Sequence, residues 1–274
     1  MTTPWEPDPS AFGLRSRANT PPVIEPGALR PVLTGRYVWD YWPVRTRAGE
    51  VADLAGRVGW VALSVADDIE PEDRHFIASL RFASSAAGEA GWVDHGELFP
   101  DGAIGARQWA GSTVYDPDSG RLDVYYTACG VEGETEVTFE QRITHAAGRL
   151  AGEGASLTAG DWAAHRVILE GDGTAYAPTA GEKALPGRIN AFRDPAFFRD
   201  PADGSEYLLF TATVPDSGSE FDGAVGIARS SAGGWELMPP LVTAVGVNKE
   251  LERPHIVIGP SGGYYLFFTT HYWT

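Results

Sequence analysis

The sequence DPDSGRLDVYYTA at residues 116–128 returns in altered form as DPADGSEYLLFTA at residues 200–212 and as GPSGGYYLFFTT at residues 259–270. Each copy begins with a turn signal, in which Asp-Pro or Gly-Pro is followed by Gly. An apolar run rich in aromatic residues follows and ends at Thr or Thr-Ala. This pattern predicts the tip of a β-hairpin and its outgoing strand, three times over.

A second strand-like run precedes each of these turns. The three runs are RQWAGSTVY at 107–115, FRDPAFF at 192–198 and LERPHIVI at 251–258. Six or seven residues before each turn, the same register holds Trp109 and Ala110, then Arg193 and Asp194, then Glu252 and Arg253. A looser fourth copy is YVWDYWPV at 37–44, followed by VGWVALSV at 58–65.

Repeated strand–turn–strand units at uneven spacing are typical of a β-propeller with loop insertions. The fold class predicted is therefore all-β. In a propeller the innermost strands surround a central funnel, so equivalent strand ends converge there. Asp40, Asp194 and Glu252 are then expected to share one site. A β-sandwich with coincidental hairpins is the alternative that the repeats leave open.

Composition excludes several classes of partner. The net charge of −16 argues against nucleic acid, which requires clustered Lys and Arg, and against an anionic membrane surface. No apolar stretch approaches the about 20 residues of a membrane-spanning helix. The N-terminus lacks the apolar core of a secretory signal, so localisation is left open between the cytoplasm and a non-Sec export route. Residues 1–34 are expected to form an extended lead-in, and residues 35–274 a single propeller domain.

Three acidic residues stand in contexts suited to glycoside cleavage. This reaction needs two carboxyl groups that flank the scissile bond. Asp40 lies in VWDYWP, Asp194 in FRDP and Glu252 in LERP. Aromatic neighbours raise the pKa of a carboxyl group and an adjacent Arg lowers it, so similar groups can take different tasks. Taken singly, each motif also fits a surface turn or ion pair.

The order of these motifs resembles glycoside hydrolase family 68, the levansucrases, inulosucrases and β-fructofuranosidases. The resemblance rests on VWDYWP (38–43), DRH (73–75), QWAGS (108–112), FRDP (192–195) and GVNKELERPH (246–255). Between them, GIARS (226–230) and WELMPPLVTAVGVN (235–248) are similar to the same family. The resemblance extends from about residue 35 to the end of the sequence.

This resemblance implies a five-bladed propeller, with about four blades in this chain, and fructosyl transfer from sucrose with retention. Asp40 is implied as the nucleophile, Glu252 as the acid and base, and Asp194 as the residue that binds fructosyl hydroxyls. Trp39, Trp109 and Arg193 are implied to line the fructosyl subsite, with Glu250 near the glucosyl side. The implied partners are sucrose and sugar acceptors, and no cofactor is expected.

The sequence departs from the family pattern at several positions. Ala110 stands where the family usually has the Ser that hydrogen-bonds the nucleophile, and Ala196 replaces a polar residue. Lys249 replaces an Asp that helps to hold calcium in some relatives, so no metal is expected. The last blade is expected to be missing, and to be supplied by a C-terminal segment or a partner chain.

Three functions therefore stay open. The first is a fructosyltransferase or β-fructofuranosidase that acts on sucrose. The second is another propeller glycosidase, since related propellers share an Asp, Asp, Glu layout. The third is an inactive fragment or a non-catalytic carbohydrate-binding relative, which Ala110, Ala196 and the missing blade motivate.

Overall fold

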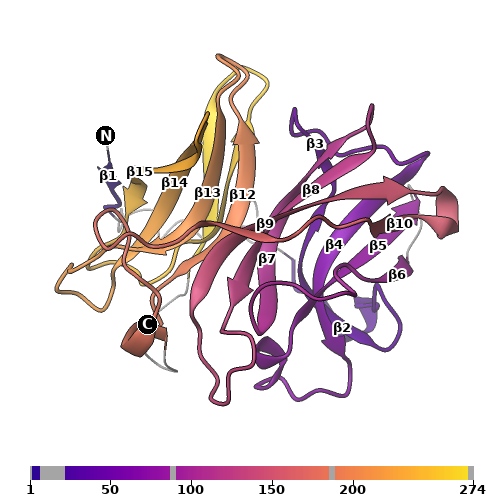
Figure 1. Cartoon of the computed structure of the whole chain (residues 1–274), viewed down its shortest axis with the longest axis horizontal. Coiled ribbons are helices and arrows are strands. Elements are labelled where there is room, and N and C mark those ends of the chain that lie inside the picture. Colours follow the sequence, from indigo (N-terminus) through magenta and orange to yellow (C-terminus); the bar gives the residue numbers. More distant parts are fainter. Residues whose placement is uncertain (1, 7–21, 87–90, 185–188, 271–274) are drawn as a thin grey trace.

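The computed structural model describes residues 2–6, 22–86, 91–184 and 189–270 (Figure 1). Strands dominate these residues, and the helical segments are short 3₁₀ turns: η2 (Pro26–Ala28), η3 (Arg74–Phe76), η4 (Gly154–Ser156) and η5 (Gly181–Ala184). No helix among the described residues has the length and apolar character needed to cross a membrane. The all-β class predicted from the turns is confirmed.

Two sheets come from the first two thirds of the chain. The first has the strand order β2 (Arg36–Pro43), β4 (Arg57–Ala66), β5 (Ser79–Ala86), β6 (Val93–Glu97). The second has the order β10 (Thr158–Gly160), β9 (Gln141–Ala151), β8 (Arg121–Cys129), β7 (Arg107–Asp116), β3 (Arg45–Thr46), and β11 (Arg166–Leu169) also pairs with β9. In both, successive long strands are antiparallel neighbours, as in propeller blades.

The rest of the chain forms a third sheet and a hairpin. The third sheet has the order β1 (Thr3–Pro4), β15 (Gly234–Thr243), β14 (Gly223–Ser231), β13 (Glu206–Thr213), β12 (Phe192–Arg199). Strands β16 (Glu252–Ile258) and β17 (Tyr264–Thr269) form the hairpin. The short β1 adds part of the expected lead-in to the third sheet, while residues 7–21 of that lead-in lie outside the described residues. The described residues thus form three full blades and the first two strands of a fourth.

The innermost strands β2, β7, β12 and β16 carry the same irregularity. Each pairs with the next strand in a register that shifts at a β-bulge: at Asp40, at Ala110, at Asp194–Pro195 and at Arg253–Pro254. The prolines are tolerated because a bulge leaves a residue outside the hydrogen-bond ladder. The repeat seen in the sequence is therefore a repeat of bulged inner strands, which places one side chain per blade at an equivalent point.

Side-chain alternation explains how the sheets stack. Tyr126 of β8 packs in a core with Leu63 and Phe82 of the first sheet, whereas its neighbour Tyr125 packs in a core with Phe192 of the third. The third sheet repeats this alternation, since successive residues of β13 face the second core and a further core shared with the hairpin. Because both faces of β8 and β13 are buried, these strands read as nearly continuous apolar runs.

Apolar side chains are exposed at both ends of this stack. Tyr41 of the first sheet is 54% exposed and meets the stacked rings of Trp60 and Trp92 edge-on. On the hairpin, Tyr265 is 53% and Phe267 is 50% exposed. The prediction that a further sheet covers such faces remains a prediction.

The buried carboxylate of Asp123 on β8 contacts two basic side chains on the face that carries Tyr125. His145 Nε2 lies 2.8 Å from its Oδ1, and Arg121 donates from Nη2 at 2.7 Å and from Nε at 3.0 Å. Burial alone would raise the pKa of Asp123, but these hydrogen bonds outweigh it and lower the pKa from 3.8 to about 2. The folded state therefore gains stability from the ionised carboxylate.

Asp123→Asn is expected to lower the free energy of unfolding by about 1 to 2 kcal/mol near neutral pH. The effect is no larger because solvent screens the charge of the partly exposed Arg121. Because folding lowers the pKa of Asp123, this contribution is complete above the pKa of the unfolded state. It is lost as the pH falls through the pKa of the folded state. Urea titrations of both proteins should show a constant difference down to about pH 4 that shrinks towards pH 2. A difference independent of pH over that range would contradict the assignment.

Candidate functional site

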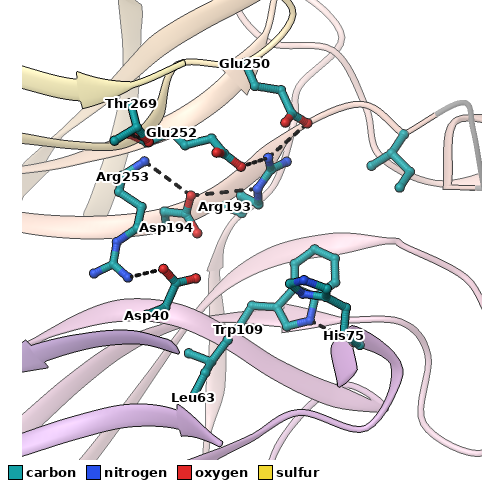
Figure 2. Close-up of a pocket in the computed structure, with 11 residues that line it drawn as sticks. Asp40, Leu63, His75, Trp109, Arg193, Asp194, Glu250, Glu252, Arg253 and Thr269 are labelled. Atoms are coloured by element: carbon teal, nitrogen blue, oxygen red, sulfur yellow. Dashed lines mark hydrogen bonds and ion pairs between the residues drawn. The ribbon is translucent and has the colours of Figure 1, made fainter. Parts of the chain in front are cut away.

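A cavity of about 220 Å³ opens where the innermost strands converge (Figure 2). These strands are neighbours in space: β2 contacts β7, β7 contacts β12, and β12 contacts β16. The residues that line the cavity are Asp40, Leu63, His75, Trp109, Ile189, Arg193, Asp194, Glu250, Glu252, Arg253 and Thr269. The three predicted carboxylic acids thus meet in one cavity, although 212 positions separate Asp40 from Glu252 in the chain (252 − 40).

Asp194 is the most enclosed of the three acids. Its side chain is 7% exposed, and its Oδ2 accepts a hydrogen bond of 3.0 Å from Thr211 Oγ1. Its backbone N–H donates to Thr127 Oγ1 at 2.9 Å, which ties β12 to the second sheet. Burial raises the pKa of Asp194, and the nearby Arg193 and Arg253 oppose that rise. A φ of 60° at Asp194, unusual for a residue with a side chain, turns the carboxyl group at the bulge.

Asp40 and Glu252 are more accessible. The Asp40 side chain is 38% exposed, and its Oδ1 lies 2.9 Å from Arg253 Nη1. The Glu252 side chain is 31% exposed, and its Oε1 accepts a hydrogen bond of 2.9 Å from Arg193 Nη2. Asp40 projects from the first sheet and Glu252 from the hairpin, so the two groups approach the cavity from different blades (Figure 2). Two carboxyl groups that approach one cavity from different sides are the arrangement that glycoside cleavage requires.

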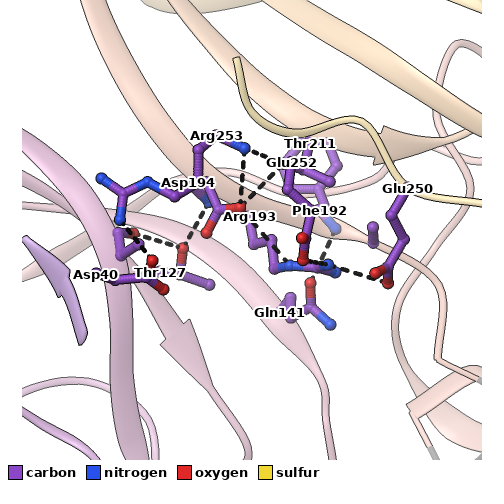
Figure 3. A network of polar contacts seen from close by, with 12 residues as sticks. Asp40, Thr127, Gln141, Phe192, Arg193, Asp194, Thr211, Glu250, Glu252 and Arg253 are labelled. Carbon is purple, nitrogen blue, oxygen red and sulfur yellow. Dashed lines mark hydrogen bonds and ion pairs between the residues drawn. The ribbon is translucent and has the colours of Figure 1, made fainter. Parts of the chain in front are cut away.

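Arg193 links the acidic residues on one side of the cavity (Figure 3). Its Nη2 lies 3.0 Å from Glu250 Oε1 and 2.9 Å from Glu252 Oε1, and its Nε lies 3.7 Å from Asp194 Oδ2. Burial disfavours the charge on this guanidinium, yet Glu250, Asp194 and Glu252 together raise its pKa. Arg193 therefore stays cationic and fixes the orientation of both glutamates.

His75 and Trp109 form another wall of the cavity, and Trp39 packs against His75. His75, from η3, stands edge-on to Trp39 with ring centroids 5.5 Å apart and to Trp109 at 6.2 Å. Trp109 Nε1 donates to the backbone oxygen of His75 at 3.2 Å. Trp109 and His75 line the cavity, whereas Trp39 packs against His75 without being among the lining residues. The wall is apolar apart from the imidazole, as suits a sugar ring.

The two substituted positions behave differently. Ala110 occupies the bulge of β7, at the position equivalent to Asp40 on β2 and Asp194 on β12. It is buried, and its backbone oxygen accepts a hydrogen bond of 3.0 Å from Thr127 Oγ1. Ala196 packs on the third core, away from the residues that line the cavity. Of the two, Ala110 therefore removes a polar group from a site-facing register.

Other reactive residue types have partners away from the cavity. His95 bonds Ser84, His145 bonds Asp123 and His165 bonds Tyr126, while His271 lies outside the described residues. Cys129 is fully buried, and burial raises the pKa of its thiol to about 12. The contacts of these described residues are structural.

Arg253, Thr211 and Thr127 were not assigned to the site from the sequence. Thr127 and Thr211 pair across from Trp109 and Arg193, next to the bulges, and Thr269 pairs across from Glu252 in the same register. The signal was present, because each repeated run carries a Thr at its end, but the hydroxyl contacts reach the following blade, which no local pattern reveals.

The family model described as Levansucrase/Invertase, glycoside hydrolase family 68, matches residues 20–222 and 213–274 of this chain. The chain belongs to this family. Levansucrase LscB of Pseudomonas savastanoi pv. glycinea is 31% identical over 96% of the chain and 68% of its own length. The levansucrase of Erwinia amylovora is 29% identical over 93% of the chain and 68% of its own length.

Solved family 68 structures agree with the observed fold. An inulosucrase from Halalkalicoccus jeotgali, bound to kestose, is 41% identical to this chain and has a TM-score of 0.83. The match covers 91% of this chain and 63% of the inulosucrase chain. The levansucrase of Gluconacetobacter diazotrophicus shares this fold, with 22% identity and a TM-score of 0.77. The match covers 90% of this chain and 61% of the levansucrase chain. The β-propeller architecture is thus established, and the chain spans about two thirds of these relatives' lengths.

Proposed function

We propose that this family 68 chain transfers the fructosyl group of sucrose to water or to a sugar acceptor through a covalent fructosyl-enzyme. The observation that carries the proposal is the convergence of Asp40, Asp194 and Glu252 on one cavity from three different sheets. Retaining glycoside cleavage requires a nucleophilic carboxylate and a carboxylic acid that flank the scissile bond. Family membership supplies the substrate class.

In the first step, a carboxylate oxygen of Asp40 attacks the anomeric carbon of the fructosyl unit. The bond from that carbon to the glycosidic oxygen breaks, and Glu252 gives its proton to the departing glucose. In the second step, Glu252 accepts a proton from water or an acceptor hydroxyl, which then attacks the same carbon and releases Asp40. Atoms and charges balance over the two steps.

Asp194 is proposed to bind fructosyl hydroxyls in the transition state. It is buried, fixed by Thr211 and Thr127, and close to two guanidinium groups. A carboxylate held this rigidly can strengthen its hydrogen bonds as positive charge develops on the sugar ring. No reorganisation of the side chain is then needed during the reaction.

The remaining predicted residues shape the two subsites. Trp109 and Trp39 are proposed to form the apolar wall against the fructosyl ring, with His75 between them. Arg193 holds Glu252 by its Nη2 and is proposed to keep it directed at the leaving oxygen. Glu250, on the far side of Arg193, is proposed to contact the glucosyl unit.

The proposal is tested by incubating the purified chain with sucrose and following free glucose and free fructose separately. Glucose in excess of fructose indicates transfer, and equal amounts indicate hydrolysis. Asp40→Asn is the matched control and should release neither sugar. Raffinose, arabinosides and fructans in parallel separate sucrose cleavage from another propeller glycosidase activity. Absence of any released sugar from every donor would reject the enzyme and favour a carbohydrate-binding function.

A further inference from the structure

We infer that Arg253 is the residue that positions the Asp40 carboxylate. The inference rests on the proposed role of Asp40 as nucleophile. It is carried by contacts of the Arg253 backbone and of its side chain, which connect the hairpin to the third and first sheets.

The backbone of Arg253 is fixed at the bulge of β16. Its φ of 51° lies in the left-handed region, and its N–H donates to Thr211 Oγ1 at 3.2 Å and to Asp194 Oδ2 at 3.4 Å. The same arrangement occurs one blade earlier, where Thr127 Oγ1 accepts the N–H of Asp194. A strained residue held by two acceptors has little freedom, so the start of the Arg253 side chain is well defined.

The side chain then crosses to the first sheet (Figure 3). Its Nη1 lies 2.9 Å from Asp40 Oδ1, and its guanidinium carbon lies 5.7 Å from the ring centroid of Trp42, two residues beyond Asp40 on β2. The ring contact and the ion pair hold the planar guanidinium from two directions. Arg253 makes the one ion pair to Asp40 among the described residues.

This geometry has a consequence for the attacking atom. The guanidinium of Arg253 binds Oδ1 of Asp40. The other carboxylate oxygen, Oδ2, is not part of this ion pair. Arg253 therefore restrains rotation of the carboxylate and leaves Oδ2 available to attack. Because its N–H is bonded to Asp194, the same residue also sets where the nucleophile stands relative to the group that binds fructosyl hydroxyls.

The test compares Arg253→Ala and Arg253→Lys with the wild type. A small misplacement of a reacting group can reduce the rate about 100-fold, so Arg253→Ala should lower kcat for glucose release on that scale while KM changes by less than about threefold. Arg253→Lys should recover part of the loss, and added guanidinium chloride at non-denaturing concentration should recover part of the loss in Arg253→Ala. Arg81→Ala, which removes an ion pair to Asp94 outside the cavity, is the control. It should keep the wild-type kcat, and guanidinium chloride should not raise its rate.

The outcomes separate this inference from the proposed function. If the wild type is active and Arg253→Ala has the same kcat, the inference is overturned and the proposed function stands. If the wild type itself releases no sugar, the proposed function fails, and carbodiimide labelling followed by peptide mass spectrometry tests the contact directly. Asp40 should then be labelled faster in Arg253→Ala than in wild type or Arg81→Ala. Equal labelling in all three overturns the inference.

Discussion

Asparagine in place of Asp40 is expected to reduce glucose release from sucrose by about 10⁴-fold or more, the largest effect expected of any substitution considered for this site. The amide is nearly isosteric and can still accept a hydrogen bond from Arg253 Nη1 through its oxygen, so the fold should be retained. What is lost is the negatively charged oxygen that forms the fructosyl-enzyme. The measurement is the initial rate of glucose release, with circular dichroism to check the fold.

Azide distinguishes loss of the nucleophile from loss of some other function at this position. In Asp40→Gly, azide can enter the space of the missing carboxylate and attack the anomeric carbon directly. A single displacement inverts the configuration, so the product should be the inverted fructosyl azide. A product of retained configuration would mean that another residue forms the covalent bond, and Asp40 would lose its proposed role.

Much of the fold could be predicted because turns and bulges leave a local signature. The Asp-Pro or Gly-Pro turn followed by an aromatic run marks the tips of β7–β8, β12–β13 and β16–β17. A count of six or seven residues back from each turn reaches the bulge, since hairpin register is fixed by the turn. Ala110, Asp194 and Arg253 therefore fall at equivalent points, and Asp40 joins them through the looser first repeat.

The contacts between blades could not be predicted in the same way. The approach of Arg253 to Asp40 joins residues that are 213 positions apart (253 − 40) and depends on how far each blade turns relative to the next. Sheet twist accumulates over whole sheets, so no local sequence pattern encodes the direction of that side chain. The repeats accordingly identified the acids, but they left the contacts of Arg253 and Thr211 with those acids undetected.

The second large effect is expected for Glu252→Gln, which should lower glucose release from sucrose by about 1000-fold, since a general acid contributes on that scale. The amide of the variant retains an oxygen that can accept the hydrogen bond from Arg193 Nη2, so the geometry of the site should be preserved. The departing glucose lacks its proton donor, which makes the first step slow. A fructosyl donor whose leaving group needs no proton, such as the fluoride, should therefore bypass most of this loss in the first step, which is measured as the burst of fluoride in the first turnover.

With that donor the second step becomes limiting in Glu252→Gln, because no base remains to activate water. The fructosyl-enzyme should accumulate and appear in the intact-protein mass spectrum as one added fructosyl unit on Asp40. Azide needs no base, so it should restore turnover and give a fructosyl azide of retained configuration, opposite to the product from Asp40→Gly. If the fluoride is cleaved as slowly as sucrose, Glu252 acts in some way other than proton transfer. The paired stereochemistry assigns nucleophile and acid independently, and it does so without reference to any relative.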